Sequence, residues 1–260
     1  MCFHNLVFDL YGTLLDIHTE ESPEVWEKTA LYFRFYGAEY TGASLQQAFE
    51  SAMALRNAQA GQSYECFPDI PFEQVLAQLF RDRGVMEKAD ALAVNAAQLF
   101  RIASIEYLRL YPHVLQALEE LRAQGYRLWL LSNAQQVFTA YELRAVGLGP
   151  QFDGVFLSSD YGCRKPDLRF FRALLDTCGL DPADCLMIGN DRDTDIAGAK
   201  AASMATLYLH TNLTPSHQAP ADPSRMPGIA PANCRHFEFE GADWKTLSRC
   251  LTELASDPHP

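Results

Sequence analysis

The sequence contains no apolar run long enough to cross a membrane. Its uninterrupted hydrophobic stretches all fall short of the ~18 residues that a spanning helix needs, although 48% of the 260 residues are hydrophobic. The first four residues lead directly into an apolar segment, and no secretory signal is expected before it. We therefore expect a globular protein with a sizeable core, large enough for one α/β domain and a smaller inserted one.

Basic residues are also scarce. The chain has 21 Lys and Arg against 33 Asp and Glu, and its formal net charge is −12. Such a charge is unfavourable for binding nucleic acid or an anionic membrane surface, so neither is expected as a partner. Any anionic substrate must instead be attracted by a local positive site.

Cysteine spacings typical of metal sites, such as C-x-x-C, are absent as well. The seven cysteines are an odd number and are scattered along the chain, at positions 2, 66, 163, 178, 185, 234 and 250. Several fall in segments that we expect to be buried. This favours reduced thiols and a cytoplasmic location.

What the sequence does contain is a series of polar residues at the ends of apolar runs. The first is Asp9, which follows the apolar residues 5–8 and precedes a turn at Gly12 and Thr13. A short apolar run stopped by a glycine turn is typical of a buried parallel strand. A carboxylate at the carboxyl end of such a strand lies where open α/β sheets form their ligand crevice.

Two further polar clusters follow later apolar runs. Ser132 and Asn133 end the run 126–131, and a helix from residue 134 would place the Ser132 hydroxyl at its N-terminus, a favourable position for an anion. Lys165 comes after the run 152–157 and directly before Pro166, which is expected to start the next helix.

A fourth cluster is an acidic loop. It follows the apolar run 185–188 and contains Asn190, Asp191 and Asp195. Each cluster alone has an ordinary structural explanation, such as a helix cap or an exposed lysine. Four of them in this order, each after an expected strand, indicate a common site.

These clusters resemble the motifs of the haloacid dehalogenase (HAD) superfamily, over residues 4–210. The resemblance implies that Asp9 is the nucleophile, Ser132 the second-motif hydroxyl and Lys165 the third-motif lysine. It also implies that Thr13, Ser132, Asn133 and Lys165 bind the substrate.

The fourth motif of that superfamily is an acidic pair, which falls on Asp191 and Asp195; the spacing leaves Asn190 as an alternative to Asp191. Attack of a carboxylate on a phosphoryl group brings negative charges together, so a divalent metal is expected between them. Oxygen ligands suit Mg²⁺, and we expect them from Asp9, the Tyr11 backbone carbonyl, Asp191 and Asp195. Because clustered carboxylates repel one another, the acidic loop itself favours a metal.

Tyr11 departs from the phosphatase pattern of the superfamily. Phosphatases usually carry Asp two residues after the nucleophile, as general acid and base. Haloacid dehalogenases have Asp-x-Tyr-Gly-Thr, as here, and a departing halide needs no proton. Those dehalogenases, however, work without metal and have a Ser-Ser-Asn fourth motif and a Trp-Arg-x-x-Gln stretch in the cap, which this chain lacks. We expect Tyr11 either to take part in proton transfer or to fill space beneath a cap.

The order of the expected elements predicts an α/β fold with an insertion. Strands and helices alternate after residue 110, which is typical of a doubly wound, Rossmann-like parallel sheet. Residues 17–109 show only helical periodicity, with helices over 23–36, 44–60, 72–83 and 89–108 and no comparable strand. The resemblance identifies this insertion as a C1 cap; the alternative is an independent helical domain. Residues 1–16 and 110–260 would then form the core.

The C-terminal part is expected to be less regular. Residues 211–235 hold five prolines and form a Pro-rich irregular loop within the core domain. An alternating segment over 235–239 predicts one more strand, and residues 244–255 predict an amphipathic helix.

We therefore expect a cytoplasmic HAD-like hydrolase, monomeric or homodimeric, with an aspartyl nucleophile and Mg²⁺. Its substrate would be a small anionic molecule, a phosphorylated metabolite with a good leaving group. The alternatives are a 2-haloacid dehalogenase and a catalytically weak, metal-binding module used for interaction. Lys28, Arg34 and Arg56 in the insertion are candidate anion contacts.

Overall fold

The computed structural model describes residues 3–59, 67–215 and 235–256. Its centre is a six-stranded sheet in the order β5-β4-β1-β6-β7-β8, in which every neighbouring pair is parallel. The strands are β1 (Asn5–Phe8), β4 (Arg127–Ser132), β5 (Gly154–Leu157), β6 (Cys185–Gly189), β7 (Ala205–His210) and β8 (His236–Glu240). The predicted fold class, a doubly wound parallel sheet, is confirmed.

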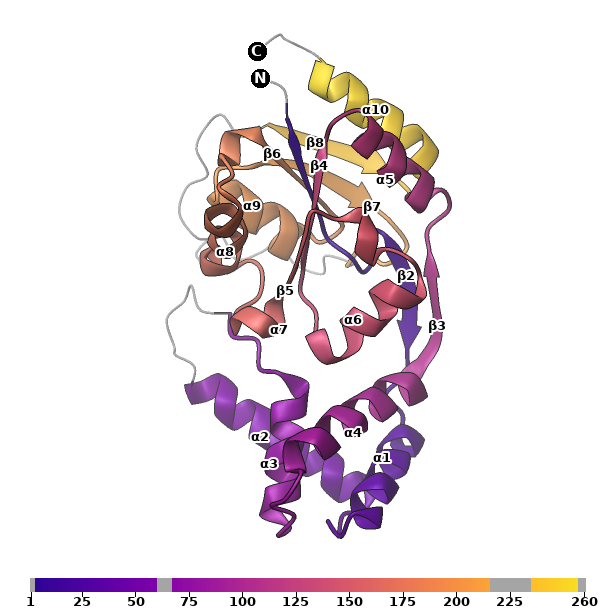
Figure 1. The fold of residues 1–260 in the computed structure, drawn as a ribbon, viewed down its shortest axis with the longest axis vertical. Helices are drawn as coiled ribbons and strands as arrows, with labels where there is room; N and C mark the ends of the chain where they lie inside the picture. The colour runs from indigo at the N-terminus through magenta and orange to yellow at the C-terminus, as the bar shows by residue number, and fades with distance from the viewer. Residues whose placement is uncertain (1–2, 60–66, 216–234, 257–260) are drawn as a thin grey trace.

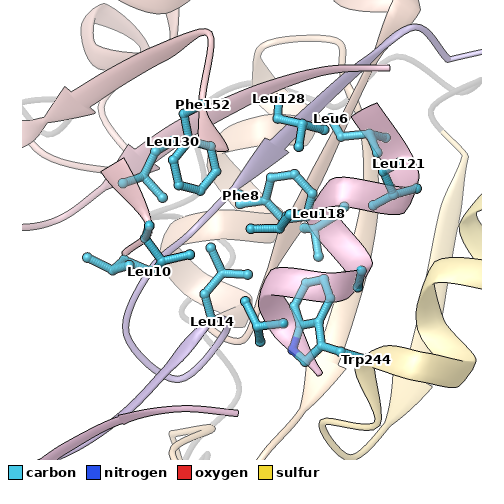
Figure 2. Close-up of a cluster of buried hydrophobic side chains, with 14 of the residues drawn as sticks. Leu6, Phe8, Leu10, Leu14, Leu118, Leu121, Leu128, Leu130, Phe152 and Trp244 are labelled. Carbon is cyan, nitrogen blue, oxygen red and sulfur yellow. The ribbon is translucent and has the colours of Figure 1, made fainter. Parts of the chain in front are cut away.

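Alternation along the central strands divides the core between the two faces of the sheet. Leu6 and Phe8 of β1 contribute to one buried cluster, and Val7, between them, contributes to another. The first cluster is closed by α5 (Val114–Ala123) and α10 (Trp244–Ser256), and the second by α8 (Leu168–Cys178) and α9 (Ala197–Ala201). Figure 2 shows the first cluster, to which β1, β4, α5 and α10 contribute side chains such as Phe8, Leu128, Leu118 and Trp244. Burial of such side chains, at roughly 1.5–3 kcal/mol each, holds the layers together.

The prediction that residues 17–109 contain no strand was wrong. β2 (Leu15–Thr19) and β3 (Ile105–Leu110) pair antiparallel and lead from the sheet to the helices of the insertion (Figure 1). Both segments alternate polar and apolar residues, which suits a ribbon with one solvated side. The helix predicted over 89–108 therefore ends at Ser104.

In its described residues, the insertion contains four helices with a hydrophobic cluster of their own. They are α1 (Pro23–Phe35), α2 (Gly42–Gln59), α3 (Phe72–Asp82) and α4 (Ala89–Ser104), close to the predicted ranges. The rings of Phe33 and Phe80 stack at the centre of this cluster with centroids 3.8 Å apart. Val137, on a helix of the core, also belongs to the cluster, so the insertion packs against the core at that point.

The remaining elements set the position of the site loops. α6 (Gln136–Ala145) begins two residues later than predicted, and α7 (Ser158–Tyr161) is a short helix where a loop was expected. A π-helical turn (Arg192–Ile196) precedes α9. The predicted strand and helix near the C-terminus are confirmed as β8 and α10. Most of the predicted Pro-rich loop lies outside the described residues. No helix in the described part of the chain has the length and apolar character to traverse a bilayer.

Candidate functional site

Asp9 lies at the carboxyl edge of the sheet, in the middle of the strand order. It follows β1, which pairs with β4 on one side and β6 on the other. The Asp9 amide donates to the Ile188 carbonyl at 2.9 Å, so the backbone is still held by the sheet where the side chain emerges. Parallel strands end at one edge, and this brings residues distant in sequence around Asp9.

Lys165 is the cation at the centre of this group. Its side chain is 1% exposed, and Nζ donates to Asp9 Oδ1 at 2.7 Å, Asp195 Oδ1 at 2.5 Å and the Leu131 carbonyl at 2.8 Å. These bonds use all three ammonium donors. Burial by itself would lower the pKa of Lys165, but the charges of Asp195 and Asp9 outweigh it, so the pKa is raised and the side chain stays charged.

Thr13 joins Asp9 to the loop after β6. Its hydroxyl lies 3.3 Å from Asp9 Oδ2 and 3.3 Å from Asn190 Oδ1. Gly12 makes this approach possible: its φ is +82°, and a Cβ there would lie 2.2 Å from Asn190 Nδ2. Only glycine meets both conditions. The side chain of Asn190 also donates from Nδ2 to the Leu213 carbonyl at 3.1 Å, which fixes the orientation of the side chain.

The acidic loop is arranged differently from the prediction. Asp195 is buried beside Lys165, and its Oδ2 accepts the Asp191 amide at 3.0 Å. Asp191 Oδ1 accepts the amides of Asp193 and Thr194 at 2.8 and 3.2 Å, so this side chain caps the turn. Asn190, not Asp191, faces Thr13 and Asp9. Lys165 is shared by Asp195 and Asp9, and the amides of Asp193 and Thr194 bind Asp191, so the two acidic side chains of the loop are engaged by different partners.

Ser132 and Asn133 are at the end of β4, as expected, but they do not begin a helix. α6 starts at Gln136, so Ser132 is not at a helix N-terminus. The Ser132 hydroxyl lies 3.5 Å from Asp9 Oδ1. Asn133 holds the backbone of Lys165 from both sides: its Oδ1 accepts the Lys165 amide at 2.7 Å and its Nδ2 donates to the Lys165 carbonyl at 3.1 Å.

Tyr11 connects the core to the insertion. Its hydroxyl donates to Glu142 Oε2 at 2.5 Å and lies 2.9 Å from Thr139 Oγ1, both on α6. Arg101, on α4, donates from Nε to Glu142 Oε1 at 2.6 Å. Burial, and then the charge of Glu142, raises the pKa of Tyr11. The phenol therefore keeps its proton and donates a hydrogen bond to Glu142, which makes it a poor proton donor to a substrate.

A cavity of about 360 Å³ lies between the core and the insertion, next to these residues. Two of its lining residues are close in sequence to the predicted site: Tyr11 is two residues after Asp9, and Asn133 directly follows Ser132. Its other lining residues are Ile17, Asp69, Arg101, Ala134, Gln135, Phe138, Thr139 and Arg164. A larger hollow of about 690 Å³ beside β7, β8 and α9 contains none of the predicted site residues.

The charged residues that line this cavity were not identified from the sequence. Arg101 and Arg164 are part of its wall. The candidates in the insertion are placed elsewhere: Arg34 pairs with Glu27 at 2.9 Å, and Arg56 donates to the Gln74 carbonyl. In the sequence, the only indication that Arg164 belongs to the site is its position directly before Lys165. Nothing local marks Arg101, because its role depends on how the insertion meets α6.

The oxygen atoms near Thr13 fit a magnesium ion. Asp9 and Asn190 present oxygens from neighbouring strand ends to the Thr13 hydroxyl. Mg²⁺ is usually held by one or two carboxylates, several waters and the substrate phosphate. Within the described residues, no three His, Cys, Asp or Glu side chains are grouped to hold a metal. An amide oxygen, the Tyr11 carbonyl and a phosphate would therefore have to complete such a site.

Comparison with known proteins is consistent with this geometry. The family model of haloacid dehalogenase-like hydrolases matches residues 3–203. The chain belongs to this family. Within it, the chain is similar to the glyceraldehyde 3-phosphate phosphatase of Methanocaldococcus jannaschii, with 28% identity over 78% of this chain and 83% of that protein. It is also similar to the phosphoserine phosphatase of Thermus thermophilus, with 29% identity over 64% of this chain and 63% of that protein.

A solved structure of a haloacid dehalogenase-like hydrolase also shares the fold. The 2-haloacid dehalogenase of Pseudomonas syringae pv. Tomato DC3000 superimposes with a TM-score of 0.59 and 20% identity, covering 96% of this chain and 99% of that one. This identity is too low to carry an activity across. Phosphatases and dehalogenases share the family fold, so the site must distinguish them.

Proposed function

We propose that this haloacid dehalogenase-like hydrolase is a phosphohydrolase in which Asp9 is the nucleophile. The observation that carries the proposal is the buried contact between Asp9 and Lys165. A carboxylate held beside an ammonium, two residues from the cavity-lining Tyr11, is poised to attack an electrophile that brings its own negative charge. The positive charge of Lys165 would offset part of the negative charge that a bound phosphoryl group brings to the nucleophile.

The other site residues have roles that follow from their positions. Ser132 and Thr13 place hydroxyls next to the two Asp9 oxygens, where they would donate to phosphoryl oxygens. Asn133 keeps Lys165 in place through its backbone. Asp195 orients the lysine ammonium from the opposite side to Asp9.

Mg²⁺ is the cofactor that the proposal includes. Phosphatases of this family generally use it. Asp9, Asn190 and the Tyr11 carbonyl would hold the ion, in place of the expected set with Asp191 and Asp195. When bound, Mg²⁺ would neutralise phosphoryl charge next to the nucleophile.

The substrate class is a small phosphorylated metabolite with a good leaving group. The names of the similar proteins from Methanocaldococcus jannaschii and Thermus thermophilus support a small phosphate ester. The cavity of about 360 Å³ suits a molecule of that size. A good leaving group is favoured because the Tyr11 proton is engaged by Glu142. We expect residues 17–109 to act as a C1 cap, and the location to be cytoplasmic.

The same tyrosine supports a second candidate, 2-haloacid dehalogenase activity. A halide departs without a proton, so an engaged Tyr11 costs that reaction nothing. The catalytically weak module remains the third possibility. A single experiment separates the three.

The test is the Asp9→Asn variant, assayed with an aryl phosphate and with a 2-haloacid. We expect aryl phosphate turnover in the wild type, and a fall of more than ~10⁴-fold in the variant, because an amide is a poor nucleophile. Wild-type protein quenched during turnover should gain the mass of one phosphoryl group in a form that hydroxylamine removes. Asp243→Asn, which changes an exposed carboxylate directly before α10, is the matched control.

Other results would identify the alternatives. Turnover of the 2-haloacid alone would establish the dehalogenase. Turnover of neither substrate by the wild type would support the inert module. Near wild-type aryl phosphate turnover in Asp9→Asn would remove Asp9 from the nucleophile role.

A further inference from the structure

The charges that line the active-site cavity do not match those of the whole chain. Two arginines, Arg101 and Arg164, and one carboxylate, Asp69, face it, in a protein with a net charge of −12. Asp69 already accepts hydrogen bonds from Gln135 Nε2 at 2.8 Å and from the Ser158 hydroxyl. Glu142 pairs with Arg101, so Arg164 is the arginine of this wall for which the described residues show no salt bridge.

No proton donor for the leaving group is evident at the usual position. The Tyr11 hydroxyl donates its hydrogen bond to Glu142 on α6. A leaving group that receives no proton departs as an anion. Its departure is then assisted by fixed positive charge rather than by general acid catalysis.

Arg164 is placed to supply such charge. Its backbone amide donates to the Phe67 carbonyl at 2.9 Å, and the next residue is Lys165, which Asn133 holds. The main chain is thus fixed while the side chain is exposed and lines the cavity. In the part of the chain that the structure describes, no hydrogen bond engages its guanidinium group; Asp69 acts on it only through charge.

Arg101 supplies a second, more rigid charge from the insertion. Glu142 binds its Nε at 2.6 Å, and its guanidinium carbon lies 5.4 Å from the ring centre of Phe138. A guanidinium has five N–H donors, so its hydrogen bonds to Glu142 and to Tyr11 leave other donors for a further acceptor. Arg101 and Arg164 reach the cavity from α4 and from the lysine loop, that is, from the insertion and from the core.

We propose that Arg164 and Arg101 receive the leaving group as an anion, so acyl, enol and aryl phosphates are hydrolysed faster than alkyl phosphates. The proposal rests on the phosphohydrolase function proposed above. In the first step Asp9 attacks phosphorus, the bond from phosphorus to the leaving oxygen breaks, and its electron pair stays on that oxygen as a carboxylate, enolate or phenolate. In the second step water attacks phosphorus, the Asp9 carboxylate is released, and both water protons remain on inorganic phosphate. Neither step needs a proton from Tyr11.

The test is the dependence of kcat/KM on leaving-group pKa, measured with a series of substituted phenyl phosphates. We expect Arg164→Gln to lose little with the most acidic phenols and about 10- to 100-fold with the least acidic, the scale of one charged hydrogen bond. Arg164→Lys should recover part of this loss. Arg172→Gln, an exposed arginine on α8 outside the cavity, is the control and should follow the wild type.

The series also separates this role from simple binding. An equal loss for every phenyl phosphate in Arg164→Gln would show that the arginine only binds substrate, and would overturn the proposal. Faster turnover of an alkyl phosphate than of acetyl phosphate by the wild type would overturn it too. For Arg101, the double variant Arg101→Gln with Glu142→Gln avoids leaving the buried Glu142 carboxylate unpaired. It should make kcat/KM depend more steeply on leaving-group pKa, as Arg164→Gln does. If the wild type hydrolyses no phosphate at all, the proposed function itself fails.

Discussion

A single buried lysine lies between two carboxylates at this site. Lys165 pairs with both Asp9 and Asp195, at 2.7 and 2.5 Å, so each carboxylate has a cationic partner, while one positive charge against two negative ones leaves a net charge of −1. Asn190 adds a neutral oxygen next to Asp9 through Thr13. The arrangement leaves room for one divalent ion rather than demanding it.

Magnesium binding should therefore depend on Asn190 more than on Asp191. We expect Asn190→Ala to weaken Mg²⁺ binding at least about tenfold, the scale on which even outer-sphere partners matter. Asp191→Asn, which alters only a turn cap, should bind nearly as the wild type does. Isothermal titration of the three proteins checks this. If Asp191→Asn loses Mg²⁺ binding and Asn190→Ala binds normally, Asp191 rather than Asn190 is the metal ligand.

At the scale of elements, residues 67–72 tie the insertion to the lysine loop. The Phe67 carbonyl accepts the Arg164 amide at 2.9 Å, and the Asp69 amide donates to the Gly162 carbonyl at 3.1 Å. Gln135, just before α6, holds the same segment: its Oε1 accepts the Phe72 amide at 2.8 Å. The insertion thus supports the loop that carries Lys165, as well as lying over the cavity.

This contact should be visible in hydrogen exchange. We expect Gln135→Ala to speed exchange of the Phe72 and Arg164 amides by about tenfold or more, because a lost hydrogen bond lowers the cost of local opening by roughly 1 kcal/mol or more. Gln136→Ala changes the exposed neighbour and serves as the control. Exchange that rises at Phe72 but not at Arg164 would show that the segment and the lysine loop open independently.

At the scale of the whole molecule, the core and the insertion meet through a buried polar network. Tyr11 follows β1, Glu142 is on α6 and Arg101 is on α4. The insertion keeps a separate hydrophobic cluster, so its orientation relative to the sheet depends on such contacts as well as on Val137. Changes in the network should therefore affect the stability of the assembled protein.

Stability should fall at alkaline pH in a way that depends on Tyr11. Its pKa is raised on folding, so above pH ~10 the unfolded chain releases a proton that the folded chain keeps. The free energy of unfolding then falls by about 1.4 kcal/mol per pH unit for this group, whereas below pH ~10 the full contribution is present. Tyr11→Phe should lose roughly 1–3 kcal/mol at neutral pH, since Glu142 loses a donor, and should show a shallower alkaline decline.

Urea unfolding between pH 7 and 11 measures both effects. Tyr141→Phe, which changes an exposed tyrosine on α6, should keep the wild-type slope. An unchanged slope in Tyr11→Phe would mean that the phenol ionises equally in the folded and unfolded chains.

The strands of the central sheet and the order of the polar clusters at their ends can be predicted from the local sequence pattern. Apolar runs such as 5–8 and 185–188 are short, strongly patterned and stopped by turn residues, so local physics is enough to predict strands ending at Asp9 and Asn190. Helical periodicity likewise predicted α1 to α4. Because parallel strands end at one edge of a sheet, the sequence also predicted that Asp9, Ser132 and Lys165 lie close together.

The contacts between these elements form only when the chain has folded, and local sequence patterns do not predict them. Asn190 faces Asp9 because Gly12, with its positive φ, lets the two loops touch. The strand β3 forms because Ile105–Leu110 finds a partner some 90 residues earlier in the chain, which no local pattern specifies. Arg101 lines the cavity because α4 packs beside α6, where Glu142 binds it. In each case the deciding interaction joins residues far apart in the chain, and its energy depends on a geometry that exists only once the elements have packed.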